Sequence, residues 1–547
     1  MVAASRIGFI HSFSFAFGRE AISVQPHAQQ SARAVDGLER PIGGCEAPNL
    51  LCHLAELRYF EAAEYKAQDA RLRPDRMAQI YGLDTTKRAT STLKGDIGRF
   101  QLFAFGFGSI IGSAWCVLVG EWLSVAGPGG AALGFIGGGI VIACIGACYA
   151  ELTARIPVTG GEFSYALSVF GRSIAFYVGW FVAFAWICVA VFEGLAIAWL
   201  FERLAPAVPD INLYTVFGGS VTRNALLIGC IGAPIIAIVN FVGGRLLARF
   251  HSVLTYSFAL VAIAVVILML CFGHTENLSP IFPQVQPVWW QGAARIFADC
   301  AFLLGGFQSI SQLVEEKSVH IQSRSVLRIL VISVSAATLF YCSVVVGTAI
   351  SVPWPDLPAH SLAFVEAARV LPGSSIIVPL VLVIAMISLL KTWNAVFLMA
   401  ARTIIALVRN GFLPGWLNRW RGPAGIPAPA VLLIFLLNVT GLMLGRGAVG
   451  ILVDTISISL VFCYAICCIA LAVLRYRTRR DSPYSVHVPV SVLAIGIIGS
   501  IVMACAAVAV PLFQAQGFPA TYLIFPGWAL IGTFIFLLVR RQSSSRT

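Results

Sequence analysis

Charged residues are scarce in this chain of 547 residues: Asp, Glu, Lys and Arg make up 11% of it, whereas hydrophobic residues make up 58%. A soluble globular protein carries about 25% charged residues. The deficit argues against a soluble protein, because a chain of this length would need more charge to cover its surface. It suits a chain that faces lipid, where each charge at mid-membrane costs about 2.5–3.5 kcal/mol.

The patterns of common enzymes and of ATP-driven pumps are also missing. The sequence has no metal-spaced His cluster, no G-x-S-x-G elbow and no G-x-x-x-x-G-K loop. Its 14 cysteines lie mostly inside apolar runs and form no paired C-x-x-C motifs, which argues against a disulfide framework or a zinc site. We therefore expect no enzyme, no metal and no cofactor.

The net charge of +12 sits in the N-terminal tail and in short loops between apolar runs. A nucleic-acid partner would require a basic face on a soluble domain, so we expect none. Alternate loops carry most of the arginines, which is the positive-inside pattern of membrane proteins. It places these loops and both termini in the cytoplasm, as in a multi-pass protein of a cytoplasmic (inner) membrane.

A membrane helix needs about 20 apolar residues, and the chain contains about twelve such runs. They cover roughly 98–120, 129–150, 173–201, 225–243, 250–272, 295–314, 326–350, 374–408, 429–445, 451–474, 488–513 and 520–539. The lipid bilayer is thus the first expected partner. Residues 1–94 contain no such run. We interpret them as a cytoplasmic tail that is disordered or loosely helical, or, over residues 1–76, as the product of a mis-assigned translation start.

Two of these runs are interrupted by glycine near their centres. The first contains FAFGFGSIIGSAW over 103–115, and the sixth contains FADCAFLLGGFQSIS over 297–311. Glycine weakens a helix by about 1 kcal/mol relative to alanine, so both helices can unwind at mid-membrane. Small-residue helix packing is the alternative for either run alone. Two interrupted helices, each the first of a group of five, favour an inverted-repeat transporter with a site at the membrane midplane.

Charges within the apolar runs are the second set of candidates. Glu193, Asp299 and Lys391 all lie at membrane depth. Each acid is either functional or a structural hydrogen-bond partner. A buried lysine requires a carboxylate, carbonyl oxygens or loss of its proton, and Glu193 is one candidate partner. We therefore interpret Lys391 as functional.

Four motifs in these segments resemble those of the amino acid–polyamine–organocation (APC) permease family. They are GSIIGSAW in the first run, YAELTARIPVTGGEFSY over 149–165, FLLGGFQ from Phe302 to Gln308 with Glu315–Glu316 following, and RTIIALVRNGFLP over 402–414. The resemblance covers about residues 95–540 in the order and spacing of the family. It implies an all-α integral membrane protein of about 12 helices, with a 5+5 inverted-repeat core of the leucine-transporter type and two C-terminal helices.

In that fold, residues 95–272 are the first repeat, 295–474 the second repeat, and 488–547 the last two helices with a C-terminal tail. The resemblance also implies the substrate site. The carboxylate end would be lined by Ser109, Ile110, Gly112, Ser113 and Ala114, and the amine end by Phe302, Leu303 and Gly305. Phe302 and Gln308 are the expected gating residues.

The chain departs from the family pattern at three places. The glycine that usually follows the motif serine is Ala114 here, followed by the bulky Trp115, and this change would either shrink the pocket or alter how deeply the substrate carboxylate sits. Gln308 replaces an acid, which disfavours strongly cationic cargo. The fifth helix has His251 near its start but no lysine at membrane depth. We expect Lys391 of the eighth run to supply the missing amine, and to gain and lose a proton during transport.

The sequence therefore predicts a secondary transporter for an amino acid, driven by protons, with sodium left open. An amine or ethanolamine permease and an amino acid exchanger are alternatives, and a non-transporting amino acid sensor is the alternative from another class. The specific cargo and the oligomeric state do not follow from the sequence.

Overall fold

The computed structural model describes residues 98–544, with gaps at 113, 157–159, 209, 243–244, 285–289, 313–321, 358–361, 421, 423–426, 478–485 and 515–517. The predicted N-terminal tail and the acidic pair Glu315–Glu316 lie outside these described residues. So does Ser113, one of the predicted site residues.

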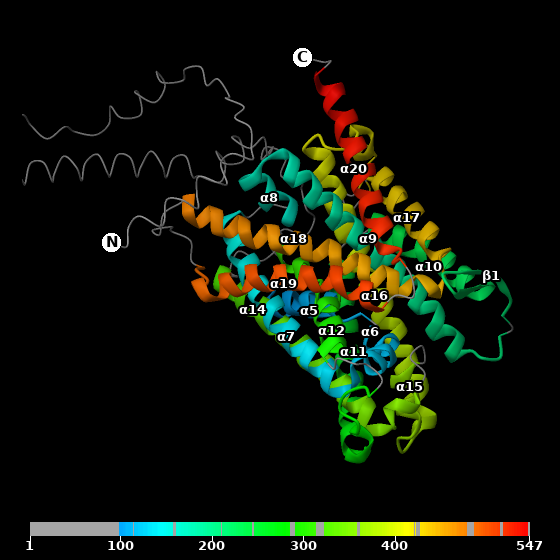
Figure 1. The fold of residues 1–547 in the computed structure, drawn as a ribbon. Coiled ribbons are helices and arrows are strands. Elements are labelled where there is room, and N and C mark those ends of the chain that lie inside the picture. The colour runs from blue at the N-terminus through cyan, green and yellow to red at the C-terminus, as the bar shows by residue number, and fades with distance from the viewer. Residues whose placement is uncertain are drawn as a thin grey trace, which may run out of the picture. The chain divides into compact units, whose positions relative to one another are not determined.

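Helices make up nearly all of the described chain (Figure 1). They are α5 (Arg99–Ile110), α6 (Ala114–Val117), α7 (Val119–Arg155), α8 (Glu162–Phe170), α9 (Arg172–Leu204), α10 (Arg223–Val242), α11 (Arg245–Phe272), α12 (Trp290–Leu303), α13 (Gln308–Gln312), α14 (Ser323–Ser351), α15 (Ala363–Arg369), α16 (Ser374–Arg409), α17 (Ala428–Leu442), α18 (Val449–Arg477), α19 (Val490–Gln514) and α20 (Thr521–Ser544). A small hairpin of β1 (Asn212–Val216) and β2 (Gly219–Thr222) connects α9 to α10. Eleven segments of the described chain are long and apolar enough to cross a membrane, and α17 is a shorter apolar helix. The protein is an all-α, multi-pass membrane protein.

The boundary between the first two predicted runs lies inside α7. Two helices meet within Val119–Arg155: Gly127 has a φ of 64°, which is not helical, and Pro128, which has no backbone N–H, follows it. A side chain at Gly127 would be strained at this φ, and its Cβ would lie 2.8 Å from the carbonyl oxygen of Ile281. The chain therefore turns sharply at Gly127, so that the first span ends there and the second begins.

Both predicted helix breaks are present. The first span is interrupted between Ile110, where α5 ends, and Ala114, where α6 begins. The sixth span is interrupted between Leu303, where α12 ends, and Gln308, where α13 begins. The same irregularity thus recurs five spans later along the chain.

The two interrupted spans lie in the middle of the helical bundle (Figure 1). On one side α7 packs against α12 and α14, and on the other α9 packs against α16 and α18. The outermost helix, α20, contacts α9 and α18 and is otherwise largely exposed. The breaks are therefore held between two groups of packed helices.

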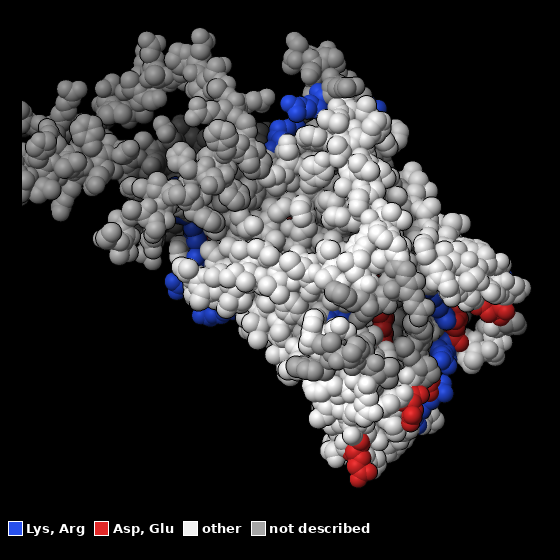
Figure 2. Space-filling view, viewed as in Figure 1, with Lys and Arg blue, Asp and Glu red and all other residues white. Residues whose placement is uncertain are grey.

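Charged side chains lie at the ends of the bundle. Arg155 ends α7, Arg172 begins α9, and Arg475 and Arg477 lie in the last turn of α18. We call the end of the bundle with these four residues the arginine end. Figure 2 shows blue side chains near the upper and left margins of the described surface, mixed charges near the lower right, and a broad uncharged surface between them. Lipid tails would contact that uncharged surface.

Candidate functional site

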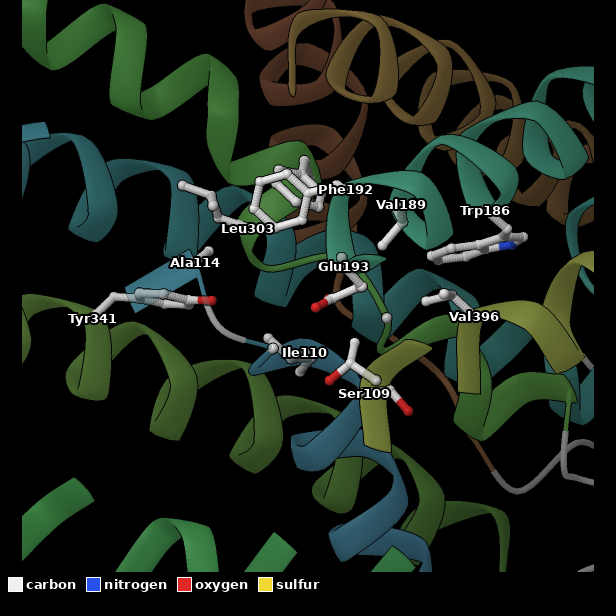
Figure 3. A pocket seen from close by; sticks show the side chains of 15 residues that line it. Ser109, Ile110, Ala114, Trp186, Val189, Phe192, Glu193, Leu303, Tyr341 and Val396 are labelled. Atoms are coloured by element: carbon white, nitrogen blue, oxygen red, sulfur yellow. The ribbon is translucent and has the colours of Figure 1, made fainter. Parts of the chain in front are cut away.

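A cavity lies where the two helix breaks meet (Figure 3). Its walls come from the interrupted spans and from α9, α14 and α16. The lining residues are Ser109, Ile110, Gly112, Ala114, Trp186, Val189, Phe192, Glu193, Phe302, Leu303, Gly305, Gly306, Tyr341, Thr392 and Val396. The cavity volume open to water is about 20 Å³, which holds about one water molecule. Any larger occupant requires the lining helices to move apart.

The structure brings the residues predicted at the two ends of the site together on this cavity. Ser109, Ile110, Gly112 and Ala114 line it from the first span, and Phe302, Leu303 and Gly305 line it from the sixth. The predicted gating residue Phe302 also packs edge-on against Phe192, with ring centroids 5.3 Å apart.

Backbone carbonyl groups at the first break accept hydrogen bonds from side chains. The hydroxyl of Ser388 on α16 donates to the carbonyl oxygen of Gly112 at 3.0 Å, and the indole nitrogen of Trp115 donates to the same oxygen at 3.0 Å. The Nζ of Lys391 donates to the carbonyl oxygen of Ile111 at 3.2 Å. These contacts stabilise the unwound segment, because an unpaired backbone group in a membrane costs several kcal/mol.

Trp115 does not line the cavity. Its ring is fully buried on the far side of the segment, among Phe258, Phe340 and Phe364. Its nearest ring neighbour is Phe364, at 4.7 Å between centroids. Trp115 therefore helps to hold the first break in place and is not part of the cavity wall.

The second break depends on Gly306 and Gln308. Gly306 has a φ of 93°, and a Cβ there would collide with the backbone of Ser109, so only glycine fits. Its N–H donates to Oε1 of Gln308 at 2.8 Å, and Nε2 of Gln308 donates to the hydroxyl of Tyr464 at 2.7 Å. The predicted gating residue Gln308 thus lies off the cavity, where it connects the break to α18.

Glu193 projects from α9 into the cavity (Figure 3). A Cβ built on Gly112 would lie 2.5 Å from its Oε1, which places the carboxylate directly against the unwound backbone. Its Oε2 is buried without a hydrogen-bond partner. Tyr341 lies close enough to interact with it electrostatically. A buried carboxylate with an unsatisfied oxygen is costly, so Glu193 is available to a proton or a ligand.

Lys391 lies on the other side of the same unwound segment. Only 3% of it is exposed, and its Nζ is 5.1 Å from the centre of the Phe258 ring. Within the described part of the chain Lys391 and Glu193 form no direct ion pair, although they interact electrostatically. The peptide groups of Ile111 and Gly112 therefore separate the two charged groups.

His251 of α11 is a further buried titratable group near Lys391. Its ring stacks on Phe105 at 4.2 Å between centroids, and it interacts electrostatically with Lys391. Its Nε2 has no hydrogen-bond partner. The sequence showed this histidine near the start of the fifth run, but only the packing shows that it faces Lys391.

Asp299 does not line the cavity. Its carboxylate pairs with Arg295 at 3.0 Å, and Arg295 also pairs with Asp454 of α18 at 2.6 Å. We call these three residues the Arg295 cluster. It lies at the opposite end of the bundle from the arginine end, because Arg295 is near the start of α12 and Asp454 near the start of α18.

The sequence reasoning missed seven residues of the cavity wall. They are Trp186, Val189, Phe192, Gly306, Tyr341, Thr392 and Val396. Trp186, Val189 and Phe192 share a helical face with Glu193, so the spacing around that acid carried a signal for them. Tyr341 lies in an ordinary apolar run, and nothing in the sequence distinguishes it.

No group of three or more His, Cys, Asp or Glu side chains within the described ranges is arranged to hold a metal ion. The site instead offers unwound backbone, one carboxylate and several aromatic faces. Such a site can bind a small polar molecule between helix ends, as in transporters with broken helices.

Comparison with known proteins agrees with this architecture. A family model described as amino acid permease matches residues 97–536. The chain is 24% identical to a vacuolar cationic amino acid transporter of Arabidopsis thaliana, over 75% of this chain and 68% of that protein. It is 27% identical to an aspartate-proton symporter of Bacillus subtilis, over 70% and 73% of the two chains. It is 21% identical to a branched-chain amino acid permease of the same species, over 86% and 98%.

The match extends over nearly all of the described residues and includes both breaks, the cavity and the membrane-crossing segments, ending within the last of them. The chain therefore belongs to the amino acid permease family.

Proposed function

We propose that this protein is a proton-coupled secondary transporter that moves an amino acid across the cytoplasmic membrane. One observation carries the proposal: Glu193 and Lys391 are both buried, on opposite sides of the unwound backbone at Ile111–Gly112. A relative named as an aspartate-proton symporter supports proton coupling in this family.

The cavity suits a zwitterion. The first break frees backbone N–H groups that can hold a carboxylate, and the end of α12 frees carbonyl groups that can hold an ammonium. The face of Phe302 lies beside that second break and can cover a cation.

Glu193 would couple proton binding to substrate binding. An ionised Glu193 beside Gly112 repels a substrate carboxylate at the same backbone, whereas a protonated Glu193 does not. Lys391 contributes a positive charge from the other side when it is protonated. Its Nζ already donates a hydrogen bond to the carbonyl oxygen of Ile111, which could otherwise be a ligand for a sodium ion. This hydrogen bond favours the proton over sodium as the coupling ion.

The orientation follows from charge. One end of the bundle, the arginine end, carries Arg155, Arg172, Arg475 and Arg477. The positive-inside rule predicts that this end faces the cytoplasm. Since α20 ends near further arginines, we place the C-terminus on the same side.

An amine permease is the second candidate. Among the described residues, Glu193 is the only charged side chain on the cavity wall, and Trp186, Phe192, Phe302 and Tyr341 surround it. A carboxylate within an aromatic cage suits an organic cation that has no carboxylate of its own.

Uptake by purified protein in liposomes tests both candidates. The panel contains labelled leucine, serine, aspartate, arginine and ethanolamine, each with and without an inward proton gradient. Gradient-driven uptake of an amino acid supports the proposal, and uptake of ethanolamine alone supports the amine permease. Uptake only into preloaded liposomes indicates an exchanger, and binding without uptake indicates a sensor.

Two substitutions at Lys391 test its titration. Lys391→Met removes the charge, and Lys391→Arg fixes it, because arginine keeps its proton in proteins. We expect both variants to lose gradient-driven uptake and to retain part of their exchange activity. Full gradient-driven uptake in Lys391→Met would refute the role of this lysine, and recovery in Lys391→Arg alone would show that charge matters but titration does not.

A further inference from the structure

A buried carboxylate without a charged partner lies outside the cavity, at the arginine end. Glu162 is the first residue of α8, in the connection between α7 and α9, and only 1% of it is exposed. Neither of its carboxylate oxygens makes a hydrogen bond of good geometry, although its own backbone N–H and the hydroxyl of Tyr149 lie near enough to oppose the effect of burial on its pKa. Such a group is rare, because burying an ionised carboxylate without a partner is strongly unfavourable.

Glu151, eleven residues earlier and on α7, shows what a structural carboxylate looks like in this protein. Its oxygens accept hydrogen bonds from Arg155, from Arg475 and from the backbone N–H of Val488. Glu162 is as deeply buried and has none of these contacts. Its position in the first turn of α8 provides a favourable helix dipole, but a dipole of this kind also acts on exposed residues and does not explain the burial.

The groups around Glu162 come from three helices and are all neutral in their ordinary forms. The titratable ones that interact with it are Tyr149 of α7, Tyr165 of α8, and Tyr464, Cys463 and Cys467 of α18. No lysine or arginine of the described residues pairs with it. Burial raises the pKa of Glu162 to about 7.

Further buried hydroxyls lie on α5, α7 and α13. The hydroxyl of Ser109 at the cavity and those of Ser309 and Ser311 on α13 have no hydrogen-bond partners, and neither does the hydroxyl of Tyr149. The Tyr149 ring contacts the Phe307 ring at 5.3 Å, and Phe307 belongs to the second break. Buried hydroxyl groups that lack a protein partner need water or a moving proton as a partner.

Gln308 and Tyr464 are two further buried polar side chains near these hydroxyls. Gln308 connects the second break to the Tyr464 hydroxyl, and the Tyr464 ring lies 6.1 Å from that of Tyr149. The hydroxyl of Tyr165 shares a hydrogen bond of 2.8 Å with Thr153 and lies close to Ser311. These contacts connect the second break, through Gln308 and Tyr464, to the side chains of Tyr149 and Tyr165 near Glu162.

We infer that Glu162 is a proton-binding site at the cytoplasmic end of the transport pathway, where it accepts the transported proton from the cavity side and releases it to the cytoplasm. The inference rests on the proposed proton coupling. One proton arrives and the same proton leaves, so Glu162 alternates between carboxylic acid and carboxylate with no other chemical change.

The first test uses the proton itself as the probe. Infrared difference spectra of the purified protein, recorded as the pH is raised, detect the carbonyl stretch of a carboxylic acid when it loses its proton. We expect a band that disappears near neutral pH in the wild type and that is missing in Glu162→Gln. Glu366→Gln is the matched control, because this carboxylate is part-exposed and paired with Arg369. An unchanged band in Glu162→Gln overturns the inference.

The second test measures transport. We expect Glu162→Gln to lose at least about 90% of gradient-driven uptake, a tenfold change, and to retain exchange, because exchange needs no net release of protons. Glu162→Asp keeps the acid and should retain pH-dependent uptake. Wild-type gradient-driven uptake in Glu162→Gln overturns the inference, as does loss of exchange together with uptake in both variants.

The two tests separate the inference from the proposed function. If the wild type shows no gradient-driven uptake at all, proton-coupled transport fails, while the infrared titration still reports on Glu162. If the wild type is driven by protons and Glu162→Gln behaves like it in both tests, only the role of Glu162 fails.

Discussion

Gly112 determines where the Glu193 carboxylate lies, because any side chain at position 112 would occupy the space of Oε1. We predict that Gly112→Ala displaces this flexible carboxylate rather than the backbone, so the protein folds with nearly unchanged stability. Uptake should fall about tenfold, the effect of about 1.4 kcal/mol of weaker binding. Liposome uptake measures the loss of transport, and the unfolding temperature in detergent measures the stability.

Gly450→Ala is the control for this prediction. Gly450 lies in α18, and a Cβ added there would meet nothing within 4 Å. It should transport like the wild type. Equal uptake by the two variants would show that the position of Glu193 is not important for transport.

At the scale of single residues, the sequence identified the chemically distinctive positions but not their mutual geometry. Glu193 and Lys391 were predicted because a charge in an apolar run is conspicuous. That they lie on opposite sides of Ile111–Gly112 depends on the packing of α9 and α16 around the break, which no spacing rule gives. The burial of Glu162 was missed for the same reason, since a loop acid is ordinarily exposed.

At the scale of elements, the Arg295 cluster connects α12 to α18 at the end opposite the arginine end. Arg295 bridges Asp299 and Asp454, and only 8% of it is exposed. Removal of one partner of a buried ion pair costs about 3–5 kcal/mol, because the remaining charge is left without compensation. The cluster therefore stabilises the packing of the first half of the sixth span against α18.

We predict that Arg295→Met lowers the unfolding temperature measured in detergent, with a loss of about 3–5 kcal/mol. The loss should shrink when Asp299→Asn and Asp454→Asn are added, since fewer uncompensated charges remain. Arg369→Gln is the control: its pair with Glu366 is half exposed and contributes at most about 1 kcal/mol. An equal effect of Arg295→Met and Arg369→Gln would contradict the role of the cluster.

Most elements followed from the period and length of the apolar runs, including both glycine breaks. One exception was the end of the first run, predicted at 120, whereas the helix that begins at Val119 continues to the turn at Gly127. The turn is imposed by contact with the backbone of Ile281, which lies far along the chain. Contacts of this kind are invisible to local sequence patterns.

At the scale of the whole molecule, Glu162 makes the folding free energy depend on pH. Its pKa is raised by burial from 4.5 to about 7 in the folded protein. The folded state therefore binds this proton more tightly than the unfolded chain does. Stability from this group is fully present below about pH 4.5 and is lost as the pH rises through about 7, by roughly 3 kcal/mol in total.

We predict that Glu162→Gln becomes more stable relative to the wild type as the pH rises from about 5 to about 8, because a neutral amide cannot ionise. Unfolding temperatures of the two proteins in the same detergent, measured across this range, give the comparison. Glu366→Gln should follow the wild-type pH dependence, since Glu366 is partly exposed to solvent. Parallel curves for wild type and Glu162→Gln would mean that the buried carboxylate finds a partner in solution, and Glu162 could then no longer be assigned as a group that titrates near neutral pH.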